Sequence, residues 1–196
     1  MKIARFTPYL KSSVFLKLLA VFSVVSFLSL ESGIAKTAAQ NEFKVTTVYL
    51  VRHAEKAAAP AADPPLLEAG TKRAEELARK LSKAGIKTIS SSQFLRTKHT
   101  AEPLAKLLGI ANTVIPVKMD TMNSRQLSPE YLKQISDLVS SSEGNVLIVG
   151  HSNTVPELIK ALGGDVAPTI DDATYDDLFV VTVYAKGKAK VAHLKQ

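Results

Sequence analysis

The chain has 196 residues, 46% of them hydrophobic and 22% charged, which fits one globular domain and excludes a disordered or collagen-like chain. It contains no cysteine, so disulfides, thiolate metal sites and a cysteine nucleophile are excluded. The formal net charge is +7, of which residues 1–35 contribute +3, and the remaining excess of +4 is scattered without a basic stripe, so we expect no nucleic acid partner.

The first 39 residues have the order of a secretory signal peptide. Basic residues precede an apolar run at 18–30, and small residues follow it. This run is shorter than the roughly 20 residues that span a bilayer, which argues against the alternative, a retained membrane anchor. We expect cleavage after Ala35 or Ala39 and export to the periplasm or the medium. The mature domain, residues 40–196, would then make no stable membrane insertion.

Strands and helices are predicted to alternate through the rest of the chain. Short β-branched and aromatic runs predict strands, and amphipathic spacing such as that of Leu77 and Leu81 predicts helices. The strands are expected at residues 45–51, 86–90, 113–117, 145–149, 178–185 and 190–194, and the helices at 66–81, 94–108, 129–139 and 154–162. This alternation predicts an α/β fold, a three-layer α/β/α sandwich with a largely parallel central sheet and a C-terminal hairpin.

Two of the predicted strands end at a histidine. Arg52 and His53 follow the first strand, and His151 follows the strand at 145–149. Ligands of parallel sheets bind beyond the carboxyl ends of the strands, so these side chains are expected at one edge. A neutral imidazole is a competent nucleophile near neutral pH, and a guanidinium can hold a phosphate through two hydrogen bonds. The combination favours phosphoryl chemistry on a small anionic substrate.

Other interpretations of the histidines stay open at this point. Each strand-end histidine could be a half-buried side chain satisfied by the backbone. A zinc site would need a third protein ligand and would suffer repulsion from Arg52, so we expect no metal and no other cofactor. His99 and His193 are expected at the surface or in packing. An acidic run before the last strands is expected to be a solvated loop: Asp171, Asp172, Asp176 and Asp177.

Three ordered segments carry a resemblance to a known family. They are LVRHAEK at 50–56, SSQFLRTKHTAEPLA at 91–105 and VLIVGHSNT at 146–154. Together they resemble the histidine phosphatase superfamily, which includes the cofactor-dependent phosphoglycerate mutases. The resemblance implies a phosphoglycerate mutase-like fold in which His53 takes the phosphoryl group. It also implies that Arg52 and Arg96 clamp the phosphate oxygens and that His151 donates to them, so that charge is compensated without a metal.

The chain departs from the superfamily pattern at Ala54, Gln93 and His99, where members often have Gly, Pro and Gln. None of these changes removes a phosphate ligand. The general acid that protonates the leaving alcohol is open, because members take it from different loops. Glu55 and Asp120 are candidates, although each could be an ordinary solvated carboxylate.

The resemblance implies a metal-independent phosphatase that hydrolyses phosphomonoesters through a phosphohistidine on His53, and the signal-peptide pattern adds the expectation that it is exported. The chain leaves little room for the capping insertions of mutases and phytase-like members, and Ser152 stands where the phytase-like branch has an acid. It is more similar to the small phosphatases, including those that act on phosphohistidine proteins. The alternatives are a phosphomutase and a non-catalytic phosphate-binding or interaction protein. The sequence predicts no oligomeric state.

Overall fold

The computed structural model describes residues 44–166 and 168–196. The predicted signal peptide and both of its cleavage sites lie outside the described residues. Within the described ranges, every helix is too short or too polar to span a bilayer.

Strands and helices alternate along the described chain, as the sequence predicts. They are β1 (Thr46–Arg52), α2 (Glu68–Leu81), β2 (Ile86–Ser91), α3 (Leu95–Leu108), β3 (Asn112–Val114), α4 (Pro129–Ser141), β4 (Asn145–Gly150), α5 (Thr154–Ala161), β5 (Asp177–Ala185) and β6 (Lys188–Lys195). Strand β3 is shorter than expected, because Pro116 lacks the N–H that a sheet ladder requires. The segment that follows β3 is therefore a loop.

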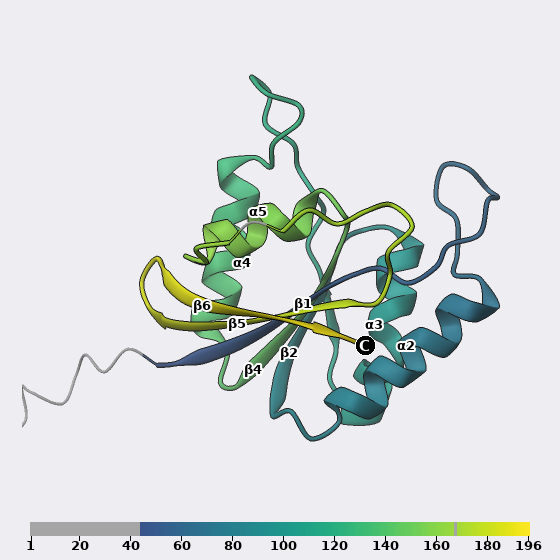
Figure 1. Ribbon diagram of the computed structural model, residues 1–196, viewed down its shortest axis with the longest axis horizontal. Coiled ribbons are helices and arrows are strands. Elements are labelled where there is room, and N and C mark those ends of the chain that lie inside the picture. The colour runs from purple at the N-terminus through teal and green to yellow at the C-terminus, as the bar shows by residue number, and fades with distance from the viewer. Residues whose placement is uncertain (1–43, 167) are drawn as a thin grey trace, which may run out of the picture. The chain divides into compact units, whose positions relative to one another are not determined.

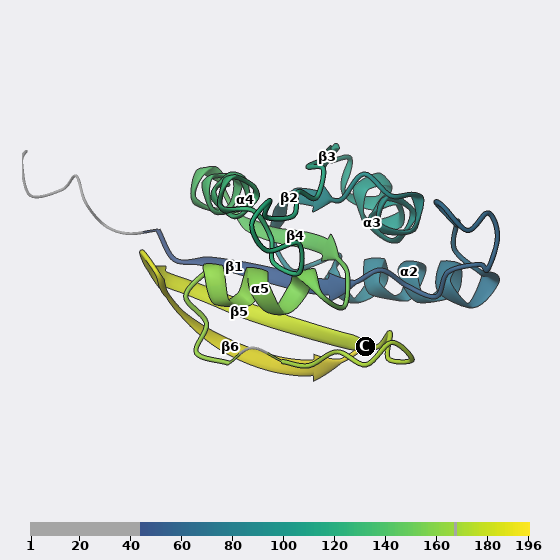
Figure 2. The same ribbon diagram turned by 90° about the horizontal axis from the view of Figure 1, so that it is seen from above.

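The strands form one sheet in the order β3-β2-β4-β1-β5-β6, and β3 is labelled in the second view (Figures 1 and 2). Strands β3, β2, β4 and β1 run parallel, whereas β5 is antiparallel to β1 and β6 is antiparallel to β5. The prediction of a largely parallel sheet with a C-terminal hairpin is confirmed.

Helices cover both faces of the sheet, which gives the predicted three layers (Figures 1 and 2). In β1, Val48 and Leu50 belong to a core cluster that includes residues of α4 and α5. Val51 belongs to the opposite cluster, with residues of α2 and α3. All three side chains are fully buried, and they follow the alternation by which successive strand residues face opposite sides.

The helix ends follow their local sequence. The hydroxyl of Ser128 accepts a hydrogen bond from the Tyr131 N–H at 3.2 Å, and Pro129 takes the first position of α4. Helix α3 contains Pro103 and ends at Gly109 in the left-handed conformation, with φ at 65°. This ending brings the chain back towards β3.

Candidate active site

The strand-end residues meet at the carboxyl edge of the sheet, as predicted. Strands β1 and β4 are parallel neighbours in which Arg52 is in register with Gly150. The N–H of His53 donates to the carbonyl of Gly150 at 2.9 Å, which places His53 beside His151. Helix α3 starts beyond the end of β2 and supplies Arg96 from its first turn.

A pocket of about 390 Å³ opens at this edge. It is lined by residues that follow β1, β2, β3 and β4, namely His53, Lys56, Gln93, Phe94, Arg96, Val117, Met119, His151, Ser152, Asn153 and Thr154. The structure thus brings together both predicted histidines and Arg96. Arg52 is not among the lining residues and is 6% exposed.

The proton of His53 can be assigned from its hydrogen bond. Its Nδ1 lies 2.8 Å from the carbonyl oxygen of Ala54. Because a carbonyl only accepts, Nδ1 carries the proton and Nε2 keeps its lone pair. The ring of His151 lies close by, with 5.4 Å between the centroids. Nε2 of His53 is therefore the nitrogen available for nucleophilic attack.

Burial keeps both rings neutral. It lowers the pKa of His53 from 6.5 to about 4, and the neighbouring charges of Arg52 and Arg96 act in the same direction. The pKa of His151 is lowered to about 3 by burial first, then by His53 and by Arg96. At neutral pH the site therefore holds two uncharged imidazoles beside two guanidinium groups.

A chain of hydroxyls supports His151. The hydroxyl oxygen of Ser92 lies 2.9 Å from Nε2 of His151 and 2.8 Å from the hydroxyl oxygen of Thr97. Ser92 is thus the partner of Nε2 of His151, and Nδ1 of His151 has no hydrogen-bond partner among the described residues. Ser92 follows β2 directly and lies within the motif at 91–105, but nothing in its residue type predicts a contact with His151.

The Arg52 guanidinium is held by the loop that precedes β5. Its Nη1 donates to the carbonyls of Asp171, Asp172 and Thr174 at 2.9, 2.9 and 3.1 Å. The guanidinium carbon lies 4.3 Å from the ring centroid of Tyr175, a cation–π contact. The sequence does not predict these contacts, because every residue has a backbone carbonyl and the residue type does not indicate which carbonyls accept.

The Arg96 guanidinium lies 4.3 Å above the Phe94 ring, and its Nη1 lies 3.9 Å from the Asp63 carboxylate. The Nε–H of Arg96 and that of Arg52 are both buried, and neither has a hydrogen-bond partner among the described residues. A buried donor without a partner is costly, and a guanidinium prefers the oxygens of an anion. The two arginines thus offer unused donors.

The two candidate general acids do not line the pocket. Arg73 donates to both carboxylate oxygens of Glu55 at 2.6 to 3.0 Å, and this hydrogen bond lowers the pKa of Glu55. The Asp120 carboxylate instead accepts from the backbone N–H groups of Met122 and Asn123, at 2.6 and 3.1 Å. Both carboxylates are occupied by other partners.

The expectation that the acidic run is a solvated loop is wrong at Asp177. This residue begins β5, is 5% exposed, and accepts from Lys195 at 2.6 Å and from Nε2 of His193 at 2.7 Å. The hairpin register pairs Asp177 with Lys195, so a cation covers the buried carboxylate. His193 also stacks on Phe179, with 4.6 Å between the centroids.

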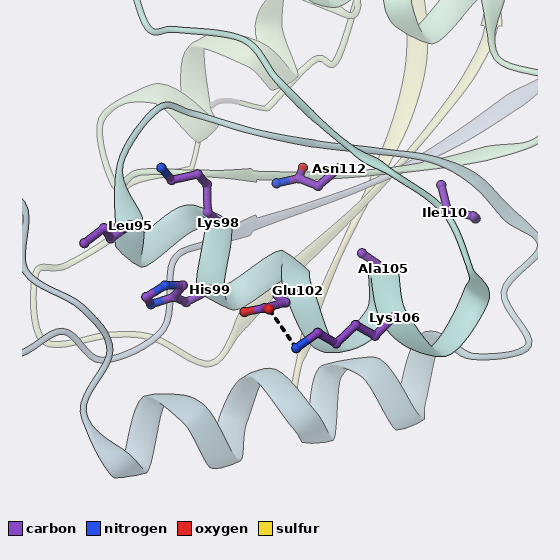
Figure 3. A pocket seen from close by; sticks show the side chains of 8 residues that line it. All are labelled: Leu95, Lys98, His99, Glu102, Ala105, Lys106, Ile110 and Asn112. Carbon is purple, nitrogen blue, oxygen red and sulfur yellow. Dashed lines mark ion pairs between the residues drawn. The ribbon is translucent and has the colours of Figure 1, made fainter.

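A separate pocket of about 470 Å³ lies along α3 (Figure 3). His99 lines it, together with Lys98 and an ion pair between Glu102 and Lys106 of 2.7 Å. This pocket shares no lining residue with the pocket that contains His53 and His151. His99 is therefore a surface residue, as expected.

Comparison with known proteins supports the family suggested by the motifs. Residues 48–122 match the model of the histidine phosphatase superfamily (branch 1). A protein of Yersinia pestis named a probable phosphoglycerate mutase GpmB is 32% identical over 120 residues, which are 55% of this chain and 56% of that protein. The match thus spans about half the length of this curated relative.

Solved structures share the fold over most of their length. The protein histidine phosphatase SixA in complex with tungstate has a TM-score of 0.58 at 21% identity, over 76% of this chain and 97% of that one. A protein of Agrobacterium tumefaciens assigned as phosphohistidine phosphatase SixA is 27% identical, with a TM-score of 0.56, over 77% and 98%. The strand-end histidines and arginines lie at one edge of a phosphoglycerate mutase-like sheet, and over residues 48–122 the chain is similar to the histidine phosphatase superfamily.

Proposed function

We propose that the protein is an exported phosphatase that hydrolyses phosphomonoesters through a phosphohistidine on His53. One observation carries the proposal. A neutral imidazole with a free Nε2 lies beside two arginines whose buried Nε–H groups have no partner among the described residues. Such a site is complementary to an oxyanion, and a phosphate group supplies one.

The reaction proceeds in two displacements. The Nε2 lone pair of His53 attacks phosphorus, a nitrogen–phosphorus bond forms, and the bond from phosphorus to the leaving oxygen breaks. The leaving oxygen takes up a proton and departs as the alcohol. Water then attacks phosphorus, the nitrogen–phosphorus bond breaks, and inorganic phosphate leaves together with a proton, which restores neutral His53.

Arg52, Arg96 and His151 stabilise the transferring group. Charge spreads over its equatorial oxygens in the transition state, and guanidinium and imidazole donors compensate this charge without a metal ion. The proton for the leaving oxygen comes from Glu55 or Asp120 in this proposal. Glu55 would first have to separate from Arg73, and Asp120 from its own turn.

The test is turnover of a generic aryl phosphate by the purified chain without added metal. His53→Ala is expected to lower kcat/KM by about a thousandfold or more, since the nucleophile is lost. His99→Ala, a histidine outside the site, is the matched control and is expected to leave turnover unchanged. Full activity of His53→Ala would overturn the mechanism.

The likeness to SixA proteins favours a second candidate, hydrolysis of phosphohistidine. Phosphorylated histidine and phosphomonoesters offered to the same preparation distinguish the two, because the preferred substrate has the higher kcat/KM. Transfer to a second hydroxyl in preference to water would instead indicate a mutase. Tight binding of vanadate without turnover would indicate a non-catalytic phosphate-binding protein.

A further inference from the structure

One wall of the active-site pocket is apolar. Phe94, Val117 and Met119 line it, and all three are half-buried. Val117 and Met119 come from the loop after β3, and they also pack against the core cluster beneath α4 and α5. The pocket thus combines phosphate-binding groups with a hydrocarbon surface.

The wall is held in place by hydrogen bonds of the loop. The backbone N–H of Val117 donates to the side-chain oxygen of Gln93 at 2.9 Å. Met119 forms an isolated antiparallel bridge with Leu127, closed by a bond of 2.8 Å from the Ser128 N–H to the Lys118 carbonyl. Gln93 is one of the positions at which this chain departs from the superfamily pattern, so its contact with the wall is a feature of this chain.

Phe94 closes the wall next to the reacting groups. Its ring meets His151 edge to face, with 5.4 Å between the centroids, and carries Arg96 over its surface. The carboxylates of the loops around the site already have partners: Glu55 pairs with Arg73, Asp63 with Arg96 and Asp172 with Arg52, and Asp120, next to Met119 in the chain, accepts from backbone N–H groups of its own turn. A leaving group at this wall therefore meets hydrocarbon, and the neighbouring carboxylates are already engaged.

We propose that Phe94, Val117 and Met119 bind the group that carries the phosphate and select phosphate esters of phenols over those of sugars. An aromatic ring gains free energy when such a wall removes it from water, whereas sugar hydroxyls would lose their hydrogen bonds there. A phenolate is also a weaker base than an alkoxide and needs less help from a proton donor. This inference rests on the proposed function, because it describes the leaving-group side of the same pocket.

The direct test is binding to the full-length protein by calorimetry, with phenylphosphonate and methylphosphonate as probes. Both probes carry a phosphonate anion, and neither can be hydrolysed. The difference between their affinities therefore measures the contribution of the apolar wall to binding. We expect phenylphosphonate to bind about tenfold more tightly, the lower end of what a hydrophobic pocket gains from added hydrocarbon. Val117→Thr and Met119→Gln, which keep the side-chain size, should reduce this preference at least threefold and leave methylphosphonate binding unchanged.

The control is Val114→Thr, the same replacement at an exposed position of β3, which should keep the full preference. Equal affinities for the two phosphonates, or a preference that survives both wall variants, would overturn the inference. Binding can be measured without turnover. A protein that prefers phenylphosphonate but hydrolyses no phosphate ester would therefore refute the proposed phosphatase activity and leave the inference about the apolar wall intact. Comparing phenyl phosphate with a phosphotyrosine peptide as substrates then shows whether the phenol is a small molecule or a protein side chain.

Discussion

Burial keeps His53 and His151 neutral by lowering their pKa values. As a consequence, the free energy of unfolding depends on pH. The unfolded chain has histidines with a pKa near 6.5, whereas the folded values are about 4 and about 3. Between these values the unfolded chain binds more protons than the folded one. The free energy of unfolding therefore falls as the pH falls from about 6.5 towards 4, and this contribution is fully present above 6.5.

We expect this fall to be smaller in a double variant, His53→Gln with His151→Gln, because neither glutamine takes up a proton. Urea denaturation at pH 7.5 and at pH 5 gives the comparison. If the double variant lost as much stability as the original chain over this range, the pKa values of the two histidines would not be lowered by burial.

Ser92 is expected to act on catalysis through His151. Ser92→Ala removes the hydroxyl that contacts Nε2 of His151, so the ring loses the partner that selects its protonated nitrogen. We expect kcat/KM to fall by about 10- to 100-fold, the usual effect of losing such a supporting contact. The pH profile of kcat/KM should also shift, which a purely structural change would not cause.

The control for Ser92 is Ser90→Ala, on the same strand. Ser90 is 1% exposed, and its hydroxyl has no partner among the described residues. This replacement should leave kcat/KM within about twofold, which is less than 1 kcal/mol. Equal losses in the two variants would mean that Ser92 matters for packing alone.

At the scale of elements, much of the fold follows from the sequence. The strand predicted at 145–149 and the helices predicted at 129–139 and 94–108 are confirmed as β4, α4 and α3. The loop at 115–119 could not be predicted, because it is held by a side-chain bond from Gln93 and by a bridge from Met119 to a distant residue. Burial of Asp177 likewise depends on Lys195, which only the hairpin register brings near.

Two glycines that both have positive φ are expected to differ in their tolerance of alanine. A Cβ on Gly109 would meet no atom within 4 Å, so Gly109→Ala should cost about 1 kcal/mol from the left-handed backbone alone. A Cβ on Gly163, where φ is 92°, would collide with the backbone of Gly187 and Lys188 at the β5–β6 turn. Gly163→Ala should therefore cost at least about 3 kcal/mol.

Urea denaturation of the two glycine variants at neutral pH measures this difference. Similar midpoints for both would show that the turn between β5 and β6 moves away freely, and that its packing on the end of α5 contributes little to stability.

At the scale of the whole molecule, the predicted site residues fall into two groups: those at the end of a strand or the start of a helix, and those in loops. His53, His151 and Arg52 stand at strand ends, and Arg96 begins the helix after β2, so chain order alone brings them near one edge. The candidate general acids, Glu55 and Asp120, lie in loops, where chain order does not fix the position of a side chain. In the structure Glu55 forms an ion pair with Arg73. Local sequence marks the residues that we propose as nucleophile and phosphate clamps, whereas the position of a proton donor depends on loop contacts.

Export is tested on the protein that cells release. Our proposal is that residues 1–35 or 1–39 are removed, so N-terminal sequencing of the product should begin at Lys36 or at Gln40. A product that begins at Met1 and stays with the membrane fraction would refute the signal peptide and favour an anchor.

The central claim, covalent catalysis by His53, is tested most directly by trapping the intermediate. The chain is mixed with a radiolabelled aryl phosphate, quenched in base within milliseconds, and digested for peptide mapping. We predict an acid-labile label on the peptide that contains His53, at a level that rises before steady state and is absent from His53→Gln. Steady turnover with no label on His53, or a label that persists in His53→Gln, would contradict the account.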